Sequence, residues 1–326
     1  MKVTDFEGGW LYGPKTFAEV TGRSAIWSRV PPVLDVMDGH RPCPLCGATG
    51  APDELFVKGQ WDYSRCRTCR MVYTAHAPTP ASLDDYYQNG GAPKDWVEHI
   101  QGHRVELDLD RRKFRWALRL TDWGPRMSLA DIGCSTGTLL EVAKEMAAAN
   151  TNLSACEPNE DALKIAIDRV TPDFACTNIK ALVERGAPHD FVVLWEVLEH
   201  VLDPKGLLYE ASKIIDEGTV IVCVPNMSSL AARILHEKAP MFGTGHLQMY
   251  TPRTLRQSIL AVWPEAEVKM YSIISWVKEV KNWLTFRSPF ASDDPSVESF
   301  FEMNPEWVCD NLYGYKLVAI AKVGGA

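Results

Sequence analysis

The sequence has 326 residues, of which 46% are hydrophobic and 23% are charged, so it can bury a substantial core. Its length suits one sizeable α/β domain and a smaller unit, because domains commonly hold about 100 to 200 residues. A formal net charge of −8, with no block of Lys and Arg, argues against a nucleic acid partner. No apolar run reaches the roughly 20 residues of a membrane span, and a secretory signal is missing at the start. We therefore expect a cytoplasmic protein that contacts neither membrane nor nucleic acid, and its oligomeric state is left open.

Residues 1–40 are rich in Gly, Pro and aromatic side chains and show no sustained hydrophobic period. They are predicted to form an irregular N-terminal arm.

Two C-x-x-C pairs lie in residues 41–80, formed by Cys43 with Cys46 and by Cys66 with Cys69. Metal binding explains these pairs better than disulfides, since the chain is long and carries no export signal. Four thiolates from two tight turns satisfy the tetrahedral preference of zinc and leave no coordination position open. The pattern predicts a small zinc-ribbon-like module that holds a structural Zn²⁺.

A Pro-punctuated linker follows and leads into a helix predicted to start at Ser82. Residues 94–122 place apolar side chains at steps of three and four, which predicts one or two helices in a lead-in over 81–125. Short apolar runs then alternate with amphipathic stretches, a pattern typical of a parallel sheet with helices on both faces. The predicted helices cover residues 138–149, 159–169, 178–185 and 204–215.

The tail holds two strand candidates, 267–275 and 315–323, on either side of a polar and aromatic insert at 276–310. We expect these strands to complete the sheet with an antiparallel edge.

A glycine turn follows the first predicted strand of the main domain, in the segment from Asp131 through Gly133 and Cys134 to Gly137. Glycines allow a close approach of the backbone to a ligand, and the helix that follows offers free N–H groups. Glu157 ends the next strand, where an acidic side chain accepts the hydroxyls of a ribose. Together these features predict a nucleoside pocket, and the turn differs from the G-x-G-x-x-G of dinucleotide folds.

The stretch from Ser128 to about Tyr250 resembles class I S-adenosylmethionine-dependent methyltransferases through LADIGCSTG, ACEPN, HDFVVLWEVLEHVLDP, TVIVCVPN and GHLQMYTPRTL, and with the cysteine-rich segment the resemblance spans about residues 41–262. The preceding CPLCG, CRTCRMVY and DDYY make the chain similar to bacterial enzymes that methylate sugars or natural-product intermediates. The resemblance implies a Rossmann-like, doubly wound, mostly parallel seven-stranded sheet in residues 81–326. Two positions depart from the family pattern, namely Cys134 in the glycine turn and Arg70 after the last cysteine of the module.

The resemblance also implies how the cofactor S-adenosylmethionine is held. Its methionine end is expected beside Asp131, Gly133, Cys134 and Gly137, its ribose on Glu157, and its adenine near Thr177, Asn178 and Ile179.

Trp195 and Glu196 end the fourth strand, at the crevice where open α/β sheets bind ligands. The Trp195 ring could attract the sulfonium cation or serve only to cap the core. Glu196 and His200 are predicted on one face of a helix, with Glu199 between them, and the set resembles the acidic-histidine cluster of ubiquinone-type O-methyltransferases. Proton transfer, a divalent cation and purely structural hydrogen bonds all fit these residues.

His246 lies in a Gly-rich loop after the fifth strand and is the first candidate for a general base, although a packing role suits a lone histidine equally. The acceptor is expected to contact the N-terminal arm, Tyr86, Tyr87, the loop 227–250 and the insert, whose apolar side chains favour a small molecule. The predicted reaction is methyl transfer to oxygen or nitrogen, with carbon left open. A non-catalytic or regulatory protein that binds a macromolecule through the zinc module is the competing hypothesis, and a protein or RNA methyltransferase is a third.

Overall fold

The computed structural model describes residues 33–89, 104–147, 151–239, 241–243, 245–273 and 305–324. The predicted arm falls mostly outside the described residues, as do residues 90–103 of the lead-in and nearly all of the 276–310 insert.

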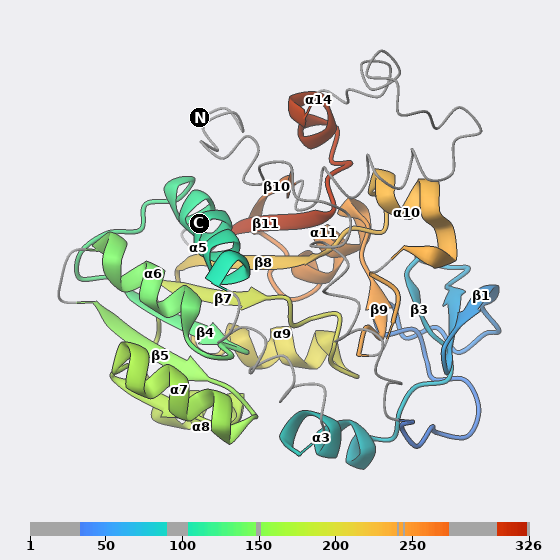
Figure 1. Cartoon of the computed structure of the whole chain (residues 1–326), viewed down its shortest axis with the longest axis horizontal. Coiled ribbons are helices and arrows are strands. Elements are labelled where there is room, and N and C mark those ends of the chain that lie inside the picture. The colour runs from blue at the N-terminus through green and yellow to red at the C-terminus, as the bar shows by residue number, and fades with distance from the viewer. Residues whose placement is uncertain are drawn as a thin grey trace.

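A seven-stranded sheet forms the centre of the molecule, with strand order β10-β11-β8-β7-β4-β5-β6 (Figure 1). All strands are parallel except β11, which pairs antiparallel with both of its neighbours. The strands are β4 (Ser128–Ile132), β5 (Asn152–Cys156), β6 (Phe174–Cys176), β7 (Phe191–Trp195), β8 (Gly218–Pro225), β10 (Glu267–Ile273) and β11 (Lys316–Val323). This is the predicted doubly wound, mostly parallel α/β fold.

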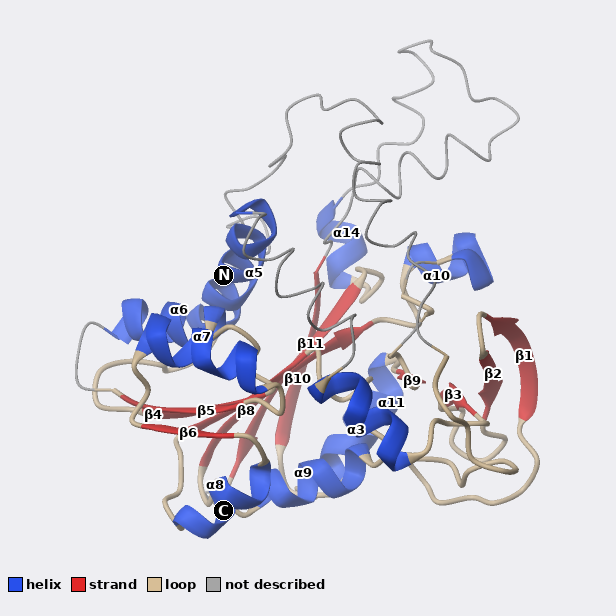
Figure 2. Ribbon diagram, turned by 60° about the horizontal axis from the view of Figure 1, so that its bottom comes forward, coloured by secondary structure: helices blue, strands red, loops and turns tan. Residues whose placement is uncertain are grey.

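Helices cover both faces of the sheet (Figure 2). One face carries α5 (Arg104–Arg119), α6 (Thr138–Ala147) and α7 (Glu160–Val170). The other carries α8 (Ile179–Arg185), α9 (Pro204–Ser212) and α11 (Pro252–Leu260). Because both faces are covered, the central strands are largely apolar, and all five residues of β7 are buried.

The two tail strands complete the sheet at one edge with antiparallel pairing, as predicted. β11 lies between β8 and β10, and β10 forms the edge. Five consecutive residues of β11, from Leu317 to Ala321, are buried, so both faces of this strand need cover that an interior position supplies. β10 alternates buried and exposed residues over its first half, as suits an edge.

A second sheet has the order β1-β2-β3-β9, with β1 (Asp53–Lys58), β2 (Trp61–Arg65) and β3 (Val72–Thr74) from the cysteine-rich segment. Its fourth strand, β9 (Gln248–Met249), comes from the chain that follows β8 and was not predicted. In Figure 1 the blue β1 and β3 lie beside β9 at one side of the molecule. Residues 41–80 therefore share their sheet with the larger domain, and the proposed boundary at residue 80 stays a prediction.

Arg41 fastens the two parts of the chain together. Its buried guanidinium donates to the main-chain oxygens of Thr74, Leu202 and Leu247 and to Oε1 of Gln248. Burial lowers the pKa of Arg41 to about 10, so the side chain keeps its charge at neutral pH. These bonds fix the start of the cysteine-rich segment against the loop after β7 and against β9.

Four short helices complete the described chain: α3 (Pro80–Gln88), α10 (Leu230–Leu235), η2 (His236–Lys238) and α14 (Pro305–Asp310). The helix predicted to start at Ser82 begins at Pro80, because the Thr79 side chain caps it by accepting from the Ser82 amide. Among the described residues, no helix has the length and apolar character needed to cross a membrane.

Candidate functional site

The turn between β4 and α6 depends on glycine at two positions. Gly133 and Gly137 have φ values of +78° and +79°, in the left-handed region that side chains rarely adopt. A Cβ on Gly133 would lie 2.5 Å from Cγ2 of Val197, so the turn also packs closely against the chain that leaves β7. The amides of Gly133 and Cys134 both donate to the main-chain oxygen of Cys156, at 2.7 and 3.1 Å.

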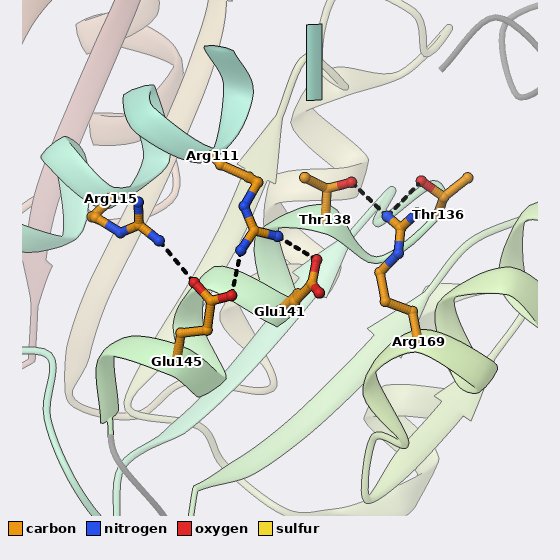
Figure 3. A network of polar contacts seen from close by, with 7 residues as sticks. All are labelled: Arg111, Arg115, Thr136, Thr138, Glu141, Glu145 and Arg169. Atoms are coloured by element: carbon orange, nitrogen blue, oxygen red, sulfur yellow. Dashed lines mark hydrogen bonds and ion pairs between the residues drawn. The ribbon is translucent and has the colours of Figure 1, made fainter. Parts of the chain in front are cut away.

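Two groups of polar contacts brace this turn from the helices beside it (Figure 3). Arg169 of α7 donates to the hydroxyls of Thr136 at 3.2 Å and Thr138 at 2.8 Å. Thr136 and Thr138 flank Gly137, so α7 holds the turn through its side chains. On the other side of α6, Arg111 of α5 donates to Glu141 and Glu145, and Arg115 donates to Glu145 at 2.7 Å. These contacts hold the turn against α7 and hold α6 against α5.

Two carboxyl groups lie beside the turn, at the ends of adjacent strands. Asp131 is fully buried, and neither of its side-chain oxygens has a hydrogen-bond partner among the described residues. Burial, reinforced by the nearby Glu157, raises the pKa of Asp131 to about 8. Glu157 accepts the amides of Ser135 at 2.9 Å and Asn159 at 3.0 Å, and burial raises its pKa as well. This pair suits a ligand that brings an ammonium group and hydroxyls.

The other predicted cofactor residues lie along the same strand ends. Cys134 is buried, and burial holds the pKa of its thiol well above the ordinary value, so it stays protonated. Thr177, Asn178 and Ile179 follow β6, beside Glu157, whose amide donates to the Cys176 oxygen. The Asn178 side chain caps α8 by accepting from the Ala181 amide.

Trp195 is 8% exposed and packs edge-on against Phe114 of α5, with ring centroids 5.5 Å apart. This contact matches the core-capping role that the sequence left open for it.

Glu196 does not share a helix with His200, so that part of the prediction is wrong. Glu196 has a φ of +58°, the residues up to Asp203 form turns, and α9 starts only at Pro204. The left-handed backbone turns the Glu196 side chain away from His200 and toward Lys316 of β11. Cys223 also donates to this carboxylate, at 3.3 Å.

The ion pair of Glu196 and Lys316 lies where the chain leaves β7 and enters β11, close to Lys113 and Asp110 of α5. Burial and the cation of Lys113 lower the pKa of Lys316 to about 7, while the carboxylate of Asp110 acts in the opposite direction. Lys113 itself is bound to Asp110 at 3.0 Å. Two lysines and two carboxylates therefore gather at this strand end.

Glu199, His200 and His246 form a cluster whose nitrogen and oxygen atoms lie within 4.8 Å of one another. Both oxygens of the fully buried Glu199 have no hydrogen-bond partner among the described residues, and burial raises its pKa to about 8. Nε2 of His200 is 4.0 Å from Oε1 of Glu199, and the two imidazole centroids are 4.7 Å apart. The structure thus brings His200 and His246 together and leaves Glu196 apart.

Both imidazoles are held as neutral bases. Nδ1 of His200 donates to the Gly245 oxygen at 2.8 Å, and Nδ1 of His246 donates to the Met241 oxygen. Burial lowers the pKa of His200 to about 3 and also lowers the pKa of His246. Each ring therefore keeps a lone pair on Nε2, as a general base or a metal ligand requires.

Tyr87 connects this cluster to the carboxyl pair. Its buried hydroxyl has no hydrogen-bond partner among the described residues, and burial holds its pKa well above the usual value. Its ring lies 6.0 Å from that of His200, and its main-chain oxygen accepts from the Asn159 amide group at 3.0 Å. The helix after the cysteine-rich segment therefore covers the region between Glu157 and His200.

The four cysteines of the N-terminal segment meet at one point. Their sulfur atoms all lie within 4.8 Å of one another, with Cys43 and Cys69 3.5 Å apart and Cys46 and Cys66 3.6 Å apart. A tetrahedral Zn²⁺ with bonds of about 2.3 Å separates its sulfurs by roughly 3.8 Å, so the spacing fits zinc. Arg70 has a φ of +70°, which shows that the second knuckle keeps a left-handed turn with arginine in the place of glycine.

Several residues of the site escaped the sequence analysis because their partners are distant in the chain. Lys316 follows the insert, Arg169 lies in the last turn of α7, and Asn159 reads as a helix cap, which it also is. A signal existed only for Asn159, which stands two residues after Glu157.

Comparison with known proteins gives a family match over part of the chain. Residues 104–260 match the sequence model of the family described as Methyltransferase domain. A ubiquinone biosynthesis O-methyltransferase from Parvibaculum lavamentivorans is 32% identical over 90 residues, which cover 27% of this chain and 36% of the relative. The enzyme of that name from Ruegeria pomeroyi is 31% identical over 120 residues, or 35% of this chain and 48% of the relative. The chain spans less than half the length of these two curated relatives.

Two solved structures share the fold. The plantazolicin methyltransferase BpumL in complex with SAH superposes with a TM-score of 0.50 at 16% identity, covering 74% of this chain and 94% of its own. Magnesium protoporphyrin IX methyltransferase (ChlM) from Synechocystis with bound SAH gives a TM-score of 0.50 at 13% identity, covering 76% and 100%.

Proposed function

We propose that this chain, whose residues 104–260 match the model of a methyltransferase domain, is a class I methyltransferase that transfers a methyl group from S-adenosylmethionine to a small molecule. The pair of Asp131 and Glu157 beside the glycine turn carries the proposal. The unpartnered carboxyl of Asp131 suits the ammonium of the methionine end, and Glu157 is positioned for the ribose hydroxyls. Thr177, Asn178 and Ile179 would border the adenine. An intact pair of this kind favours catalysis over a non-catalytic, partner-binding role.

The sulfonium makes the methyl carbon electrophilic, so the protein has to align the acceptor in line with the C–S bond. The acceptor oxygen or nitrogen bonds to the methyl carbon, the C–S electron pair returns to sulfur, and the acceptor proton must leave. Nε2 of His246 or His200 takes this proton, because both rings are neutral at pH 7 and keep a lone pair there. Glu199 and Tyr87 would orient the acceptor beside them.

The same cluster supports a second role, as a site for a divalent cation. The observation in its favour is that one carboxylate oxygen of Glu199 and one nitrogen of each imidazole lie within 4.8 Å of one another, and neither Glu199 oxygen has a hydrogen-bond partner among the described residues. A cation held there would polarise a hydroxyl acceptor and would lower the need for a base. Removal of metal separates the two roles, as set out in the Discussion.

The acceptor is proposed to be a sugar, a phenol or a natural-product intermediate, and its oxygen or nitrogen is the favoured target over carbon. The charged group of Glu196, Lys316, Lys113 and Asp110 lies at the ends of β7 and β8, the edge where acceptors of open α/β folds bind. Such a group suits a polar, hydroxylated molecule. The four cysteines are proposed to hold a structural Zn²⁺.

Calorimetric titration with S-adenosylmethionine and with its demethylated product tests the cofactor. We expect micromolar binding to the purified protein and its loss in Glu157→Gln, whereas Glu160→Gln, an exposed neighbour on α7, should bind as the wild type does. Transfer of a labelled methyl group to a panel of phenols and nucleotide sugars then identifies the acceptor. If a folded, zinc-loaded protein binds neither compound, the proposed activity is wrong and partner binding takes its place.

A further inference from the structure

Three side chains at one side of the second sheet form a cluster that the proposed function does not use. The ligand atoms of His40, Asp62 and His76 lie within 4.8 Å of one another. His40 precedes the first cysteine knuckle, Asp62 lies in β2, and His76 follows β3. The cluster shares no residue with the four cysteines or with the group of Glu199, His200 and His246.

Backbone hydrogen bonds bring the two histidines together. The Met37 amide donates to the Ala77 oxygen at 2.9 Å, and the Arg41 amide donates to the Ala75 oxygen at 2.8 Å, so residues 37–41 run beside 75–77. Because the guanidinium of Arg41 binds four acceptors, the backbone position of the neighbouring His40 is fixed. The rings of His40 and His76 meet edge to face with centroids 4.5 Å apart.

Asp62 orients His76 as a metal-bound histidine is oriented. Its Oδ2 lies 2.9 Å from Nδ1 of His76, and its Oδ1 accepts the His76 amide at 3.0 Å. A carboxylate on Nδ1 holds the proton there and leaves the lone pair on Nε2, which is the arrangement found around metal-ligating histidines. These bonds also explain Asp62 and His76 as a structural pair. They do not explain why a second imidazole, that of His40, packs against the ring of His76.

We propose that His40 and His76 bind a second Zn²⁺, separate from the ion of the four cysteines, with Asp62 as the carboxylate that orients His76. Imidazole is a donor that zinc prefers, and two protein ligands leave coordination positions for water. The site is open to solvent, since His40 is exposed and the His76 side chain is 43% exposed. It therefore exchanges its ion readily, whereas the four thiolates enclose theirs on all sides.

Zinc titration of the full-length protein tests the site. The starting sample carries one zinc per chain in the four-cysteine cluster, verified by elemental analysis. We expect calorimetry to show one further saturable equivalent of Zn²⁺, weakened about 10- to 100-fold by His40→Gln, by His76→Gln or by Asp62→Asn. His236→Gln, which removes an exposed imidazole of η2 elsewhere, should leave this equivalent unchanged. Retention of the first zinc shows that each variant is folded.

Copper gives an independent readout, because Cu²⁺ at this site should show an electron paramagnetic resonance spectrum with coupling to two imidazole nitrogens. That coupling should disappear in the double variant His40→Gln with His76→Gln. The proposal is overturned if the wild type takes up no further saturable zinc. It is equally overturned if the further equivalent survives the double variant and is lost in His246→Gln, since the ion then lies at the Glu199 cluster.

Discussion

The side-chain amide of Asn159 donates to the main-chain oxygen of Tyr87 at 3.0 Å, while its Oδ1 accepts the Ala162 amide and caps α7. One residue thus ties the end of α3 to the strand end that carries Glu157. Asn159→Asp keeps the cap, because aspartate is an equally good N-cap, and loses the donor to Tyr87. We expect cofactor affinity to fall about 3- to 10-fold, in line with about 1 kcal/mol for one hydrogen bond. Calorimetry measures the change.

Asn311→Asp is the matched control for this variant. Asn311 is exposed and makes the same type of bond, from its side-chain amide to the Trp307 oxygen at 2.8 Å, but on α14. The Asn311→Asp variant should bind the cofactor as the wild type does. An equal loss of affinity in both variants would show that the link to Tyr87 has no bearing on the pocket.

The raised pKa of Asp131 predicts a pH dependence of cofactor binding. Without cofactor the folded protein holds a proton on Asp131 up to about pH 8, whereas the unfolded chain releases it near its ordinary value of about 4. This group therefore lowers stability as pH rises through that window. An arriving ammonium favours the carboxylate, so binding releases the proton and affinity increases as pH rises toward 8.

Calorimetry in two buffers of different ionisation enthalpy counts the protons released. We expect close to one at pH 6 to 7 in the wild type and none in Asp131→Asn, whose affinity should also fall about 10- to 100-fold. Binding without proton release in the wild type would mean that Asp131 does not meet the ammonium.

His246→Gln should leave cofactor binding intact and lower kcat about 100- to 10,000-fold if His246 takes the proton of the acceptor. His200→Gln would have this effect instead if His200 does so. Dialysis against a chelator decides whether the cluster with Glu199 works through a cation. Unchanged kcat after chelation supports the base, whereas loss of activity that Mg²⁺ or Zn²⁺ restores supports the metal. Zinc content measured in parallel separates this effect from loss of the four-cysteine ion.

Lys316→Met should destabilise the protein by about 1 to 3 kcal/mol, because Glu196 is left as a poorly solvated and unpaired carboxylate. The double variant Lys316→Met with Glu196→Gln should recover most of this loss. Thermal unfolding of the four proteins of the cycle gives the coupling between the two side chains. Equal and additive losses would show that the pair contributes no net stability.

Removal of the zinc proposed for the four cysteines should loosen the second sheet before the first. We expect chelation, or Cys46→Ser, to speed proteolysis within residues 43–74 while the seven-stranded sheet keeps its helical and strand signal. Cys309→Ala, outside the cluster, serves as the control. Proteolysis that is unchanged after zinc is removed would contradict a structural role for the ion.

The sequence predicted the elements of the main sheet well because their patterns are local. The helix predicted at 138–149 is α6, Thr138–Ala147, and the one at 178–185 is α8, Ile179–Arg185. The glycine turn, Asp131 and Glu157 could be found in the same way, since each lies directly at a strand end. The position of β11 inside the sheet could not, because it depends on which strands pair and not on the strand pattern.

The candidate catalytic cluster was predicted only in part, for a similar reason. The amphipathic run between β7 and Pro204 reads as a helix, and the left-handed backbone of Glu196 has no sequence signal, since glycine is the usual marker. His200 and His246 were both named, but their contact and the separation of Glu196 follow from the tertiary fold. The role of each remains a prediction.

The completion of the second sheet by β9 bears on how the chain is made. Thr74 and Leu247 are joined by bonds that span 173 residues of sequence, so the sheet cannot close until the ribosome has passed β9. The cysteine knuckles emerge long before, and their early ligation would leave β3 with an open edge during most of translation. The guanidinium of Arg41 would likewise lack its acceptors on Leu202 and Leu247 until these residues have been synthesised. Newly made chains are therefore vulnerable at this edge, and a fragment that stops before residue 248 should aggregate even when zinc is abundant.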